Sequence, residues 1–208
     1  MTTIKQEDLI QSIADALQFI SYYHPTDFIR AMRGAWEREE SAAAKAALTQ
    51  VLVNSKLCAI GKRPICQDTG IVNVLISVGM DVRWDAELAL EDMINEGVRR
   101  GYTHPDNVLR GSVLVDPDGA RTNTKDNTPA VVHTRIVAGD TVEIEVAAKG
   151  GGSEAKAKFA MLNPSDSIVD WILSVVPSMG AGWCPPGILG VGIGGTPEKA
   201  MLLAKESL

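Results

Sequence analysis

Cysteine and aromatic residues are scarce in this sequence: its 208 residues include three cysteines, and aromatic residues make up 5%. No apolar run approaches the roughly 20 residues that a membrane-spanning helix needs. Residues 1–7 also lack the basic and then apolar pattern of a secretion signal. We therefore expect a cytoplasmic protein without a membrane partner. In that compartment disulfides are rare, so the thiols are expected to stay reduced, bind a metal or serve as redox groups.

Zinc-binding and nucleic-acid-binding patterns are missing as well. The sequence contains no C-x-x-C pair and no H-x-x-x-H, which argues against a zinc site built from such pairs. The net charge is −6 and the basic residues are scattered, which disfavours nucleic acid as a partner. An anionic substrate remains compatible with this charge, because a local basic cluster is enough to bind it.

The composition that is present is typical of a globular protein, with 45% hydrophobic and 22% charged residues. A chain of this length buries about 70% of its unfolded surface, enough for a core without disulfides. We expect an α+β fold, in which a helical segment over residues 1–60 packs on a mixed α/β region over residues 61–208. A single domain over residues 1–208 is the first expectation, and the possible subdivision falls near Gly61.

Hydrophobic periodicity and turn residues predict the individual elements. The apolar end of the third helix carries Cys58, for which we expect a buried structural role. Residues 131–137 and 141–147 are expected to form a β-hairpin, with His133 as a structural residue. The expected helices cover residues 9–20, 26–36 capped by Thr26, 41–57 capped by Ser41, 85–100 capped by Asp85, 154–161, 163–175 and a final helix that ends at Leu208; further strands are expected at 71–78 and 188–193.

Two loops framed by proline and glycine carry the other cysteines. In the first, residues 64–70, Cys66 offers a soft sulfur ligand, Asp68 a base or acceptor, and Gln67 a donor that does not titrate. The second, residues 183–187, contains Cys184. Iron–sulfur clusters are held by thiolates from such loops, but two cysteines alone do not hold one. Ordinary turns with idle thiols therefore remain an alternative.

Two glycine-rich stretches admit different interpretations. Residues 149–153, beginning with Lys149, suit close approach of backbone N–H groups to an anion, or else a flexible hinge. Residues 190–195 match G-x-G-x-x-G, but a dinucleotide site needs an acidic residue about 20 positions later. Only thirteen residues follow Gly195, so this interpretation is disfavoured. The polar, non-periodic residues 101–128 are expected to form a functional loop.

Several motifs occur together in one order and span nearly the whole chain. In combination they resemble the N-terminal catalytic domain of class I fumarate hydratases, with the α-type subunits of tartrate dehydratases as relatives. The motifs are I-C-Q-D-T-G at 65–70, L-R-G-S at 109–112, N-T-K-D-N-T-P-A at 123–130, K-G-G-G-S at 149–153, W-C-P-P-G at 183–187 and G-I-G-G-T at 192–196.

The resemblance implies a [4Fe-4S] cluster held by three cysteines, with one iron open to substrate. Cys66 and Cys184 correspond to two of these ligands, Cys58 does not match the third, and the third is expected beyond Leu208. The family also has a C-terminal domain or separate β-subunit that supplies further substrate contacts. We therefore expect this chain to be a fragment that is inactive alone, belonging to an enzyme that is a homo-oligomer when complete.

The resemblance also assigns roles to individual residues. Gln67 and Asp68 are expected to be catalytic and to contact the substrate, Arg110 to clamp a carboxylate, and the Gly152 N–H to donate to the substrate. The implied reaction is reversible hydration of fumarate to (S)-malate. The alternative is a dehydratase for tartrate or another hydroxy-dicarboxylate, and a dinucleotide-binding module or a non-catalytic scaffold is less favoured.

Overall fold

The computed structural model describes residues 2–184 and 186–208, and its α+β class confirms the expectation. The chain forms two compact units, Met1–Ala148 and Lys149–Leu208. None of the helices in the described residues is long and apolar enough to cross a membrane. The elements are β1 (Thr3–Lys5), α1 (Gln6–Tyr22), α2 (Thr26–Arg38), α3 (Ala42–Gly61), β2 (Ile71–Gly79), β3 (Arg83–Asp85), α4 (Leu90–Tyr102), β4 (Leu114–Val115), β5 (Thr122–Asn123), β6 (Val131–Val137), β7 (Val142–Lys149), α5 (Gly151–Glu154), α6 (Ile168–Ser178) and α7 (Pro197–Glu206).

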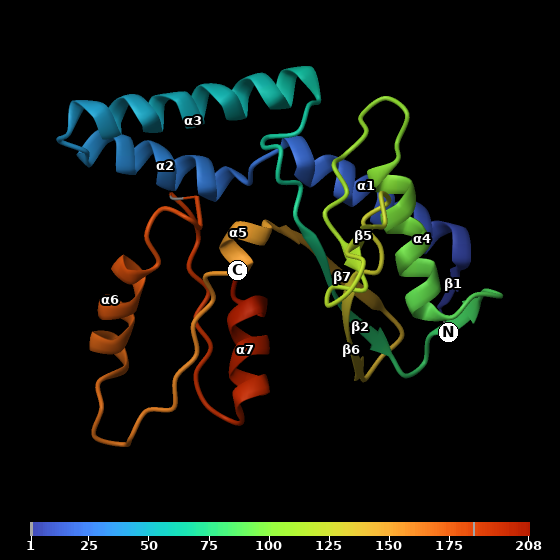
Figure 1. Ribbon diagram of the computed structural model, residues 1–208. Helices are drawn as coiled ribbons and strands as arrows, with labels where there is room; N and C mark the ends of the chain where they lie inside the picture. The colour runs from blue at the N-terminus through green and yellow to red at the C-terminus, as the bar shows by residue number, and fades with distance from the viewer. Residues whose placement is uncertain (1, 185) are drawn as a thin grey trace. The chain divides into compact units, whose positions relative to one another are not determined.

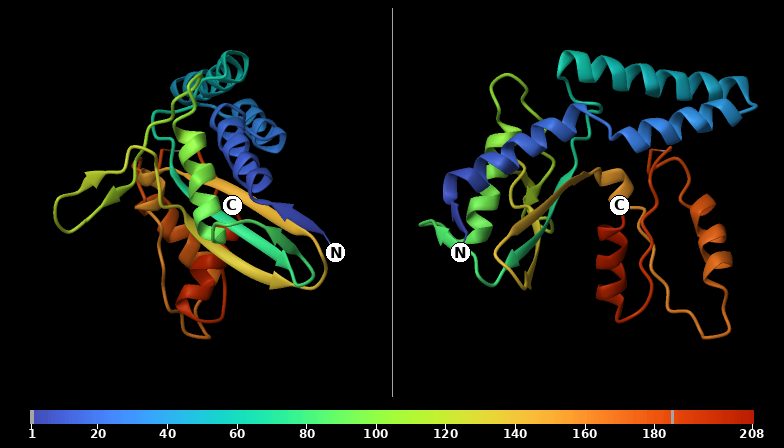
Figure 2. Two further views of the ribbon diagram at one scale, coloured as in Figure 1. Left: turned by 90° about the vertical axis from the view of Figure 1, so that its right-hand side faces the viewer. Right: turned by 180° about the vertical axis from the view of Figure 1, so that it is seen from behind.

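The core of the first unit lies between one face of a three-stranded sheet and two helices. Helices α1 and α4 lie side by side on the sheet formed by β6, β2 and β7 (Figures 1 and 2). The apolar positions of α1 that recur every three or four residues point into this core, as their spacing predicts. The buried side chains that α1, β2 and α4 contribute to this core are Leu9, Ile10, Ile13, Leu17, Val72, Val74, Ile76, Val78, Met93, Ile94, Val98 and Tyr102.

The order of strands in the sheet corrects the expected hairpin. Strands β6 and β7 follow each other in the chain, but both pair with β2, which lies between them, and β2 runs parallel to β6. Three successive residues of β2, 72–74, are buried, as suits a central strand. A Cβ on Gly79, at the end of β2, would lie 2.4 Å from the Gly139 carbonyl oxygen, so only glycine lets β2 pass this close to the β6–β7 connection.

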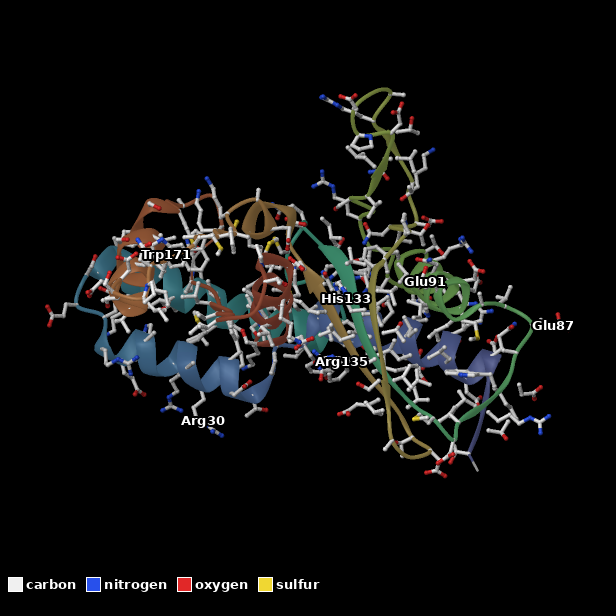
Figure 3. All side chains as sticks on the ribbon, turned by 90° about the horizontal axis from the view of Figure 1, so that it is seen from below. Arg30, Glu87, Glu91, His133, Arg135 and Trp171 are labelled. Atoms are coloured by element: carbon white, nitrogen blue, oxygen red, sulfur yellow. The ribbon has the colours of Figure 1, made fainter. Side chains whose placement is uncertain are left out.

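The predicted alternation of β7 is confirmed. Val142, Ile144 and Val146 pack against the core, whereas Glu143 and Glu145 are exposed. On β6, Val132 also packs against the core. His133 and Arg135, labelled in Figure 3, alternate with Val132 and so belong to the other face of the sheet.

Helices α2 and α3 lie against each other in Figure 1 and are joined by the turn at residues 39–41. The Trp36 indole N–H donates to Thr49 Oγ1 at 2.8 Å across this pair. Ser41 caps α3 as predicted, accepting from the Ala44 N–H. Two other cap predictions are wrong, because Thr26 is already inside α2 and Asp85 belongs to β3.

The described residues of the second unit form three helices, and several predicted boundaries shift. Helix α5 covers the glycines at 151 and 152 rather than residues 154–161, and α6 begins at Ile168 after the cap Ser167, not at residue 163. The apolar residues 188–193 form no strand and are largely exposed. The expected final helix is present as α7, which has Pro197 in its first turn and ends at Glu206 rather than at Leu208.

The G-x-G-x-x-G match has a packing role in the second unit. A Cβ on Gly190 would lie 2.1 Å from the Ala204 carbonyl oxygen, and one on Gly192 would lie 1.9 Å from that of Ala200. The segment therefore lies directly against the backbone of α7, and the Val191 N–H donates to Ser207 Oγ at 3.0 Å. These glycines permit contact between segments, so the motif needs no dinucleotide to explain it.

Candidate active site

The Cys66 loop places a thiol, an amide and a carboxylate on consecutive residues between α3 and β2. Cys66 and Gln67 are exposed and Asp68 is half-buried. The Asp68 N–H lies 3.5 Å from the Cys66 sulfur, and the Cys66 thiol lies 3.3 Å from Gln67 Oε1. Asp68 Oδ1 accepts from the Gly70 N–H at 3.2 Å, and Gly70 adopts a φ of 85°.

Arg110 is brought to the same edge of the first unit. Thr69 Oγ1 donates to the Arg110 carbonyl oxygen at 2.5 Å, which joins the Cys66 loop to the Leu109–Ser112 segment. The Arg110 side chain is exposed. No acidic partner for its guanidinium occurs in the part of the chain that the structure describes. An exposed guanidinium of this kind can bind a carboxylate with two parallel hydrogen bonds.

Tyr102, the last residue of α4, holds the Cys66 loop from the core side. Its hydroxyl lies 2.6 Å from the Thr69 carbonyl oxygen and 3.2 Å from that of Gly70. Burial raises the pKa of Tyr102 to about 12, and the nearby Asp68 charge also raises it, although the hydrogen bonds oppose this. The phenol therefore remains a hydrogen-bond donor throughout the neutral range.

Asn127 joins the Cys66 loop to the Arg110 segment. Its Nδ2 donates to the Gly70 carbonyl oxygen at 2.9 Å, while its Oδ1 accepts from the Ser112 N–H at 2.7 Å and the Val113 N–H at 3.3 Å. Asn127 has a φ of 63° and a fully buried side chain. Neither Tyr102 nor Asn127 was identified from the sequence as a site residue. Asn127 lies within the N-T-K-D-N-T-P-A motif at 123–130, which is the only signal of its role in the sequence.

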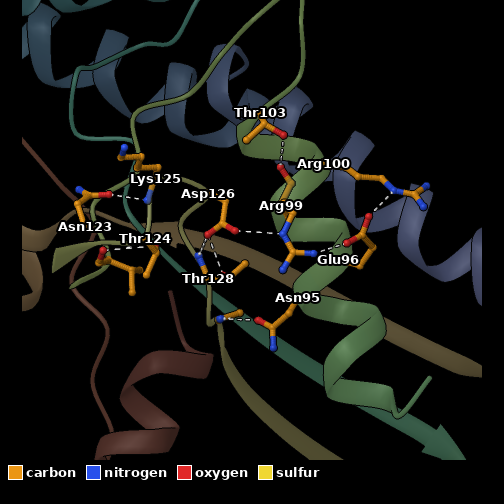
Figure 4. A network of polar contacts seen from close by, with 12 residues as sticks. Asn95, Glu96, Arg99, Arg100, Thr103, Asn123, Thr124, Lys125, Asp126 and Thr128 are labelled. Atoms are coloured by element: carbon orange, nitrogen blue, oxygen red, sulfur yellow. Dashed lines mark hydrogen bonds and ion pairs between the residues drawn. The ribbon is translucent and has the colours of Figure 1, made fainter. Parts of the chain in front are cut away.

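A set of charged contacts anchors the loop that carries Asn127 (Figure 4). The Asp126 carboxylate accepts from the Thr128 N–H and hydroxyl and from Arg99 Nε at 3.1 Å, and Arg99 also pairs with Glu96. Burial works to raise the pKa of Asp126, but the Thr128 hydrogen bonds and the Arg99 guanidinium outweigh it and lower that pKa. Arg99, in the last turn of α4, thus connects this helix to the loop that carries Asn127.

In the second unit, the structure brings the Gly152 and Cys184 segments together. A Cβ on Gly152 would lie 2.8 Å from the carbonyl oxygen of Gly182, two residues before Cys184. Cys184 is exposed, its N–H donates to the Ala181 carbonyl oxygen at 3.0 Å, and its φ of 58° is left-handed. Such a φ is uncommon outside glycine and costs about 1–2 kcal/mol, so the loop holds this cysteine in a defined orientation.

Lys149 is part of an ion-pair triad in the second unit. Glu154 Oε2 lies 2.9 Å from Lys149 Nζ and 2.5 Å from Lys205 Nζ. Burial works to raise the pKa of Glu154, but Lys205 and Lys149 outweigh it and lower that pKa. The triad fixes the ends of the glycine-rich segment to α7, because Lys149 and Glu154 flank Gly150–Ser153 in sequence.

The three cysteines differ in their fitness as metal ligands. Cys66 and Cys184 are exposed, whereas Cys58 is buried, with Asn54 Oδ1 and the Pro64 carbonyl oxygen each 3.6 Å from its sulfur. Exposed thiols on loops fit thiolate ligation of a cluster, and the buried Cys58 does not. Cys66 and Cys184 belong to different units, so their convergence stays a prediction. Within the described residues, no three His, Cys, Asp or Glu side chains form a metal-binding group.

In a comparison with known proteins, one family model and several related proteins each match most of the chain. The sequence model of the family described as "Fumarate hydratase (Fumerase)" matches residues 10–208. A putative L(+)-tartrate dehydratase subunit alpha of Methanocaldococcus jannaschii is 30% identical over 203 residues, which cover 94% of this chain and 70% of that protein. The L(+)-tartrate dehydratase subunit alpha of Escherichia coli K12 is 25% identical over 203 residues, covering 96% of this chain and 66% of that subunit.

Proposed function

Because the chain belongs to the fumarate hydratase (Fumerase) family, we propose that it is the α-type part of an iron–sulfur hydro-lyase that dehydrates L(+)-tartrate. The relatives named above are alpha subunits of tartrate dehydratases, which supports this substrate over fumarate. The observation that carries the proposal is the joined pair of loops in the first unit. One loop carries a thiol, an amide and a carboxylate, and it is bonded to the backbone of Arg110, whose guanidinium has no acidic partner among the described residues.

Dehydration of a hydroxy-dicarboxylate requires the enzyme to expel hydroxide and to remove a weakly acidic proton beside a carboxylate. When bound by Cys66 and Cys184 with a third thiolate from elsewhere, a [4Fe-4S] cluster would supply a Lewis acid for the hydroxyl oxygen. The residues of this chain would bind and orient the dianion. Arg110 would hold one carboxylate through two parallel hydrogen bonds.

The remaining residues would fix the substrate near the cluster thiols. Gln67 would donate its amide N–H to a substrate oxygen, and Asp68 would accept from a hydroxyl group. The Gly152 N–H belongs to the first turn of α5, where intrahelical acceptors are lacking. It would donate to a carboxylate that gains charge as the proton leaves. We assign the proton transfer to a partner β-subunit or C-terminal domain, and the third thiolate to a cysteine outside residues 1–208.

Fumarate hydration is the second candidate, supported by the description of the family. In the dehydration direction the two substrates, (S)-malate and L(+)-tartrate, are both dicarboxylates, and tartrate has one more hydroxyl group. A site that pairs that hydroxyl discriminates strongly against a substrate lacking it, because buried polar groups are then left without partners.

An assay panel on the complete protein, co-expressed with its partner subunit and reconstituted without oxygen, tests the proposal. The acids are L(+)-tartrate, D-tartrate, meso-tartrate, (S)-malate and fumarate. We expect the highest kcat/KM with L(+)-tartrate, followed as oxaloacetate formation. A higher kcat/KM for fumarate and (S)-malate would assign the second candidate instead, and turnover of none of these acids would overturn the hydro-lyase assignment.

A further inference from the structure

Two polar side chains lie fully buried at the edge of the first unit's apolar core. Tyr102 and Asn127 both have an exposed fraction of 0%, while the other buried residues of the core cluster are apolar. Burying a hydroxyl or an amide is costly unless its hydrogen bonds are made. Both side chains make theirs, and every bond described above goes to backbone of the loops that carry the predicted site residues.

The atoms that these side chains hold are very close in sequence to the predicted substrate contacts. Tyr102 and Asn127 share the Gly70 carbonyl oxygen, two residues after Asp68. Asn127 also accepts from the Ser112 N–H, two residues after Arg110. The Asn127 side-chain amide thus joins the backbone that follows the Cys66 loop to the backbone that follows Arg110.

We propose that Tyr102 and Asn127 are positioning residues, which set the separation and orientation of Gln67 and Asp68 relative to Arg110. This inference rests on the proposed function for its consequence in catalysis, although not for its geometry. Apolar side chains of similar size could fill the same core volume at less desolvation cost, but they could not fix the two loops in register. A displacement of about 1 Å in such a loop can reduce catalysis roughly a hundred-fold.

Tyr102→Phe is the most discriminating variant, since it removes one hydroxyl and leaves the ring that fills the core. Tyr23→Phe is the matched control, because Tyr23 is 40% exposed and its ring lies against Phe19. Asn127→Asp is the second variant: its carboxylate still accepts from the Ser112 and Val113 N–H groups but cannot donate to Gly70.

The first readout does not depend on activity. In the metal-free chain, the rate of alkylation of Cys66 by iodoacetamide is measured by mass spectrometry, with Cys184 of the same molecule as the internal standard. We expect Tyr102→Phe and Asn127→Asp to change the Cys66 rate by about three-fold or more, as a loosened loop samples open states more often. The Cys184 rate should be unchanged, and Tyr23→Phe should change neither rate.

The second readout is the kinetics of the complete enzyme. Tyr102→Phe should lower kcat/KM for the dicarboxylate by about ten-fold or more, at a temperature where circular dichroism shows the variant fully folded. An unchanged Cys66 rate in both variants, or equal changes at Cys66 and Cys184, would overturn the proposal. If the parent enzyme turns over no dicarboxylate, the proposed function fails, while the alkylation rates still decide the positioning role.

Discussion

Gly152 and its neighbour Gly151 form a matched pair that tests the contact between the glycine-rich segment and the Cys184 loop. A Cβ on Gly152 would lie 2.8 Å from the Gly182 carbonyl oxygen, whereas a Cβ on Gly151 would meet no atom within 4 Å. Both residues belong to α5. Replacing each in turn by alanine therefore changes helix propensity alike and changes packing at only one position.

The magnitude of the effect follows from this distance. A carbon–oxygen contact of this kind normally spans about 3.3 Å or more, so Gly152→Ala must move one backbone segment by roughly 0.5 Å. Overpacking of a closed site costs about 1–3 kcal/mol. Alanine in a helix regains up to about 1 kcal/mol relative to glycine in both variants. The difference between the two variants is then about 1–3 kcal/mol, because the propensity gain cancels.

Thermal unfolding and steady-state kinetics measure the two consequences. We expect Gly152→Ala to melt below Gly151→Ala by about 2–4 °C for each kcal/mol. In the complete enzyme, Gly152→Ala should lower kcat/KM about ten-fold or more, since its N–H moves with the segment. Gly151→Ala should retain kcat/KM within about two-fold, in keeping with its open surroundings. Equal melting temperatures and equal kinetics for the two variants would refute the reasoning.

Two further predictions concern the first unit. Arg110→Lys should raise KM for the dicarboxylate about ten-fold, because an ammonium group cannot form the paired hydrogen bonds of a guanidinium; an unchanged KM and kcat would remove Arg110 from the site. Asp126→Asn should lower the melting temperature at pH 7, because the lowered pKa of Asp126 means that its carboxylate stabilises the fold above its unfolded pKa. That stability is lost as the pH falls from the ordinary value of 3.8 through the folded pKa, so the gap between parent and variant should close in acid; a constant gap in melting curves would contradict this.

The sequence predicted the elements whose local signals agree with their packing. The three- and four-residue spacing of apolar residues located α1, and Ser41 located the start of α3. The β-branched residues of β2 located the central strand. These signals suffice because burial of one face and a single cap decide the local structure.

Other features depend on contacts between distant residues, which no local pattern encodes. The insertion of β2 between β6 and β7 depends on Gly79 fitting against Gly139. Residues 188–193 read as a strand because they are apolar, but Gly190 and Gly192 place them against α7 instead. Hydrophobic periodicity does not distinguish these cases.

The candidate site also combines residues that local motifs predict with residues whose role depends on contacts between distant parts of the chain. The motifs predict six site residues, whose roles stay predictions: Cys66, Gln67, Asp68, Arg110, Gly152 and Cys184. No pattern in the sequence marks Tyr102 as a site residue, and only its place in the motif at 123–130 marks Asn127. Their importance follows only from burial and from hydrogen bonds to residues 14 to 57 positions away.

Iron and sulfide contents of three single cysteine variants of the complete protein test the central claim most directly. Cys66 and Cys184 are exposed and are predicted cluster ligands, while the buried Cys58 is the control. After anaerobic reconstitution, we predict that Cys66→Ser and Cys184→Ser each lose most of the bound iron and sulfide, and that Cys58→Ser retains both. Full retention in the Cys66 or Cys184 variant, or loss confined to the Cys58 variant, would contradict the account.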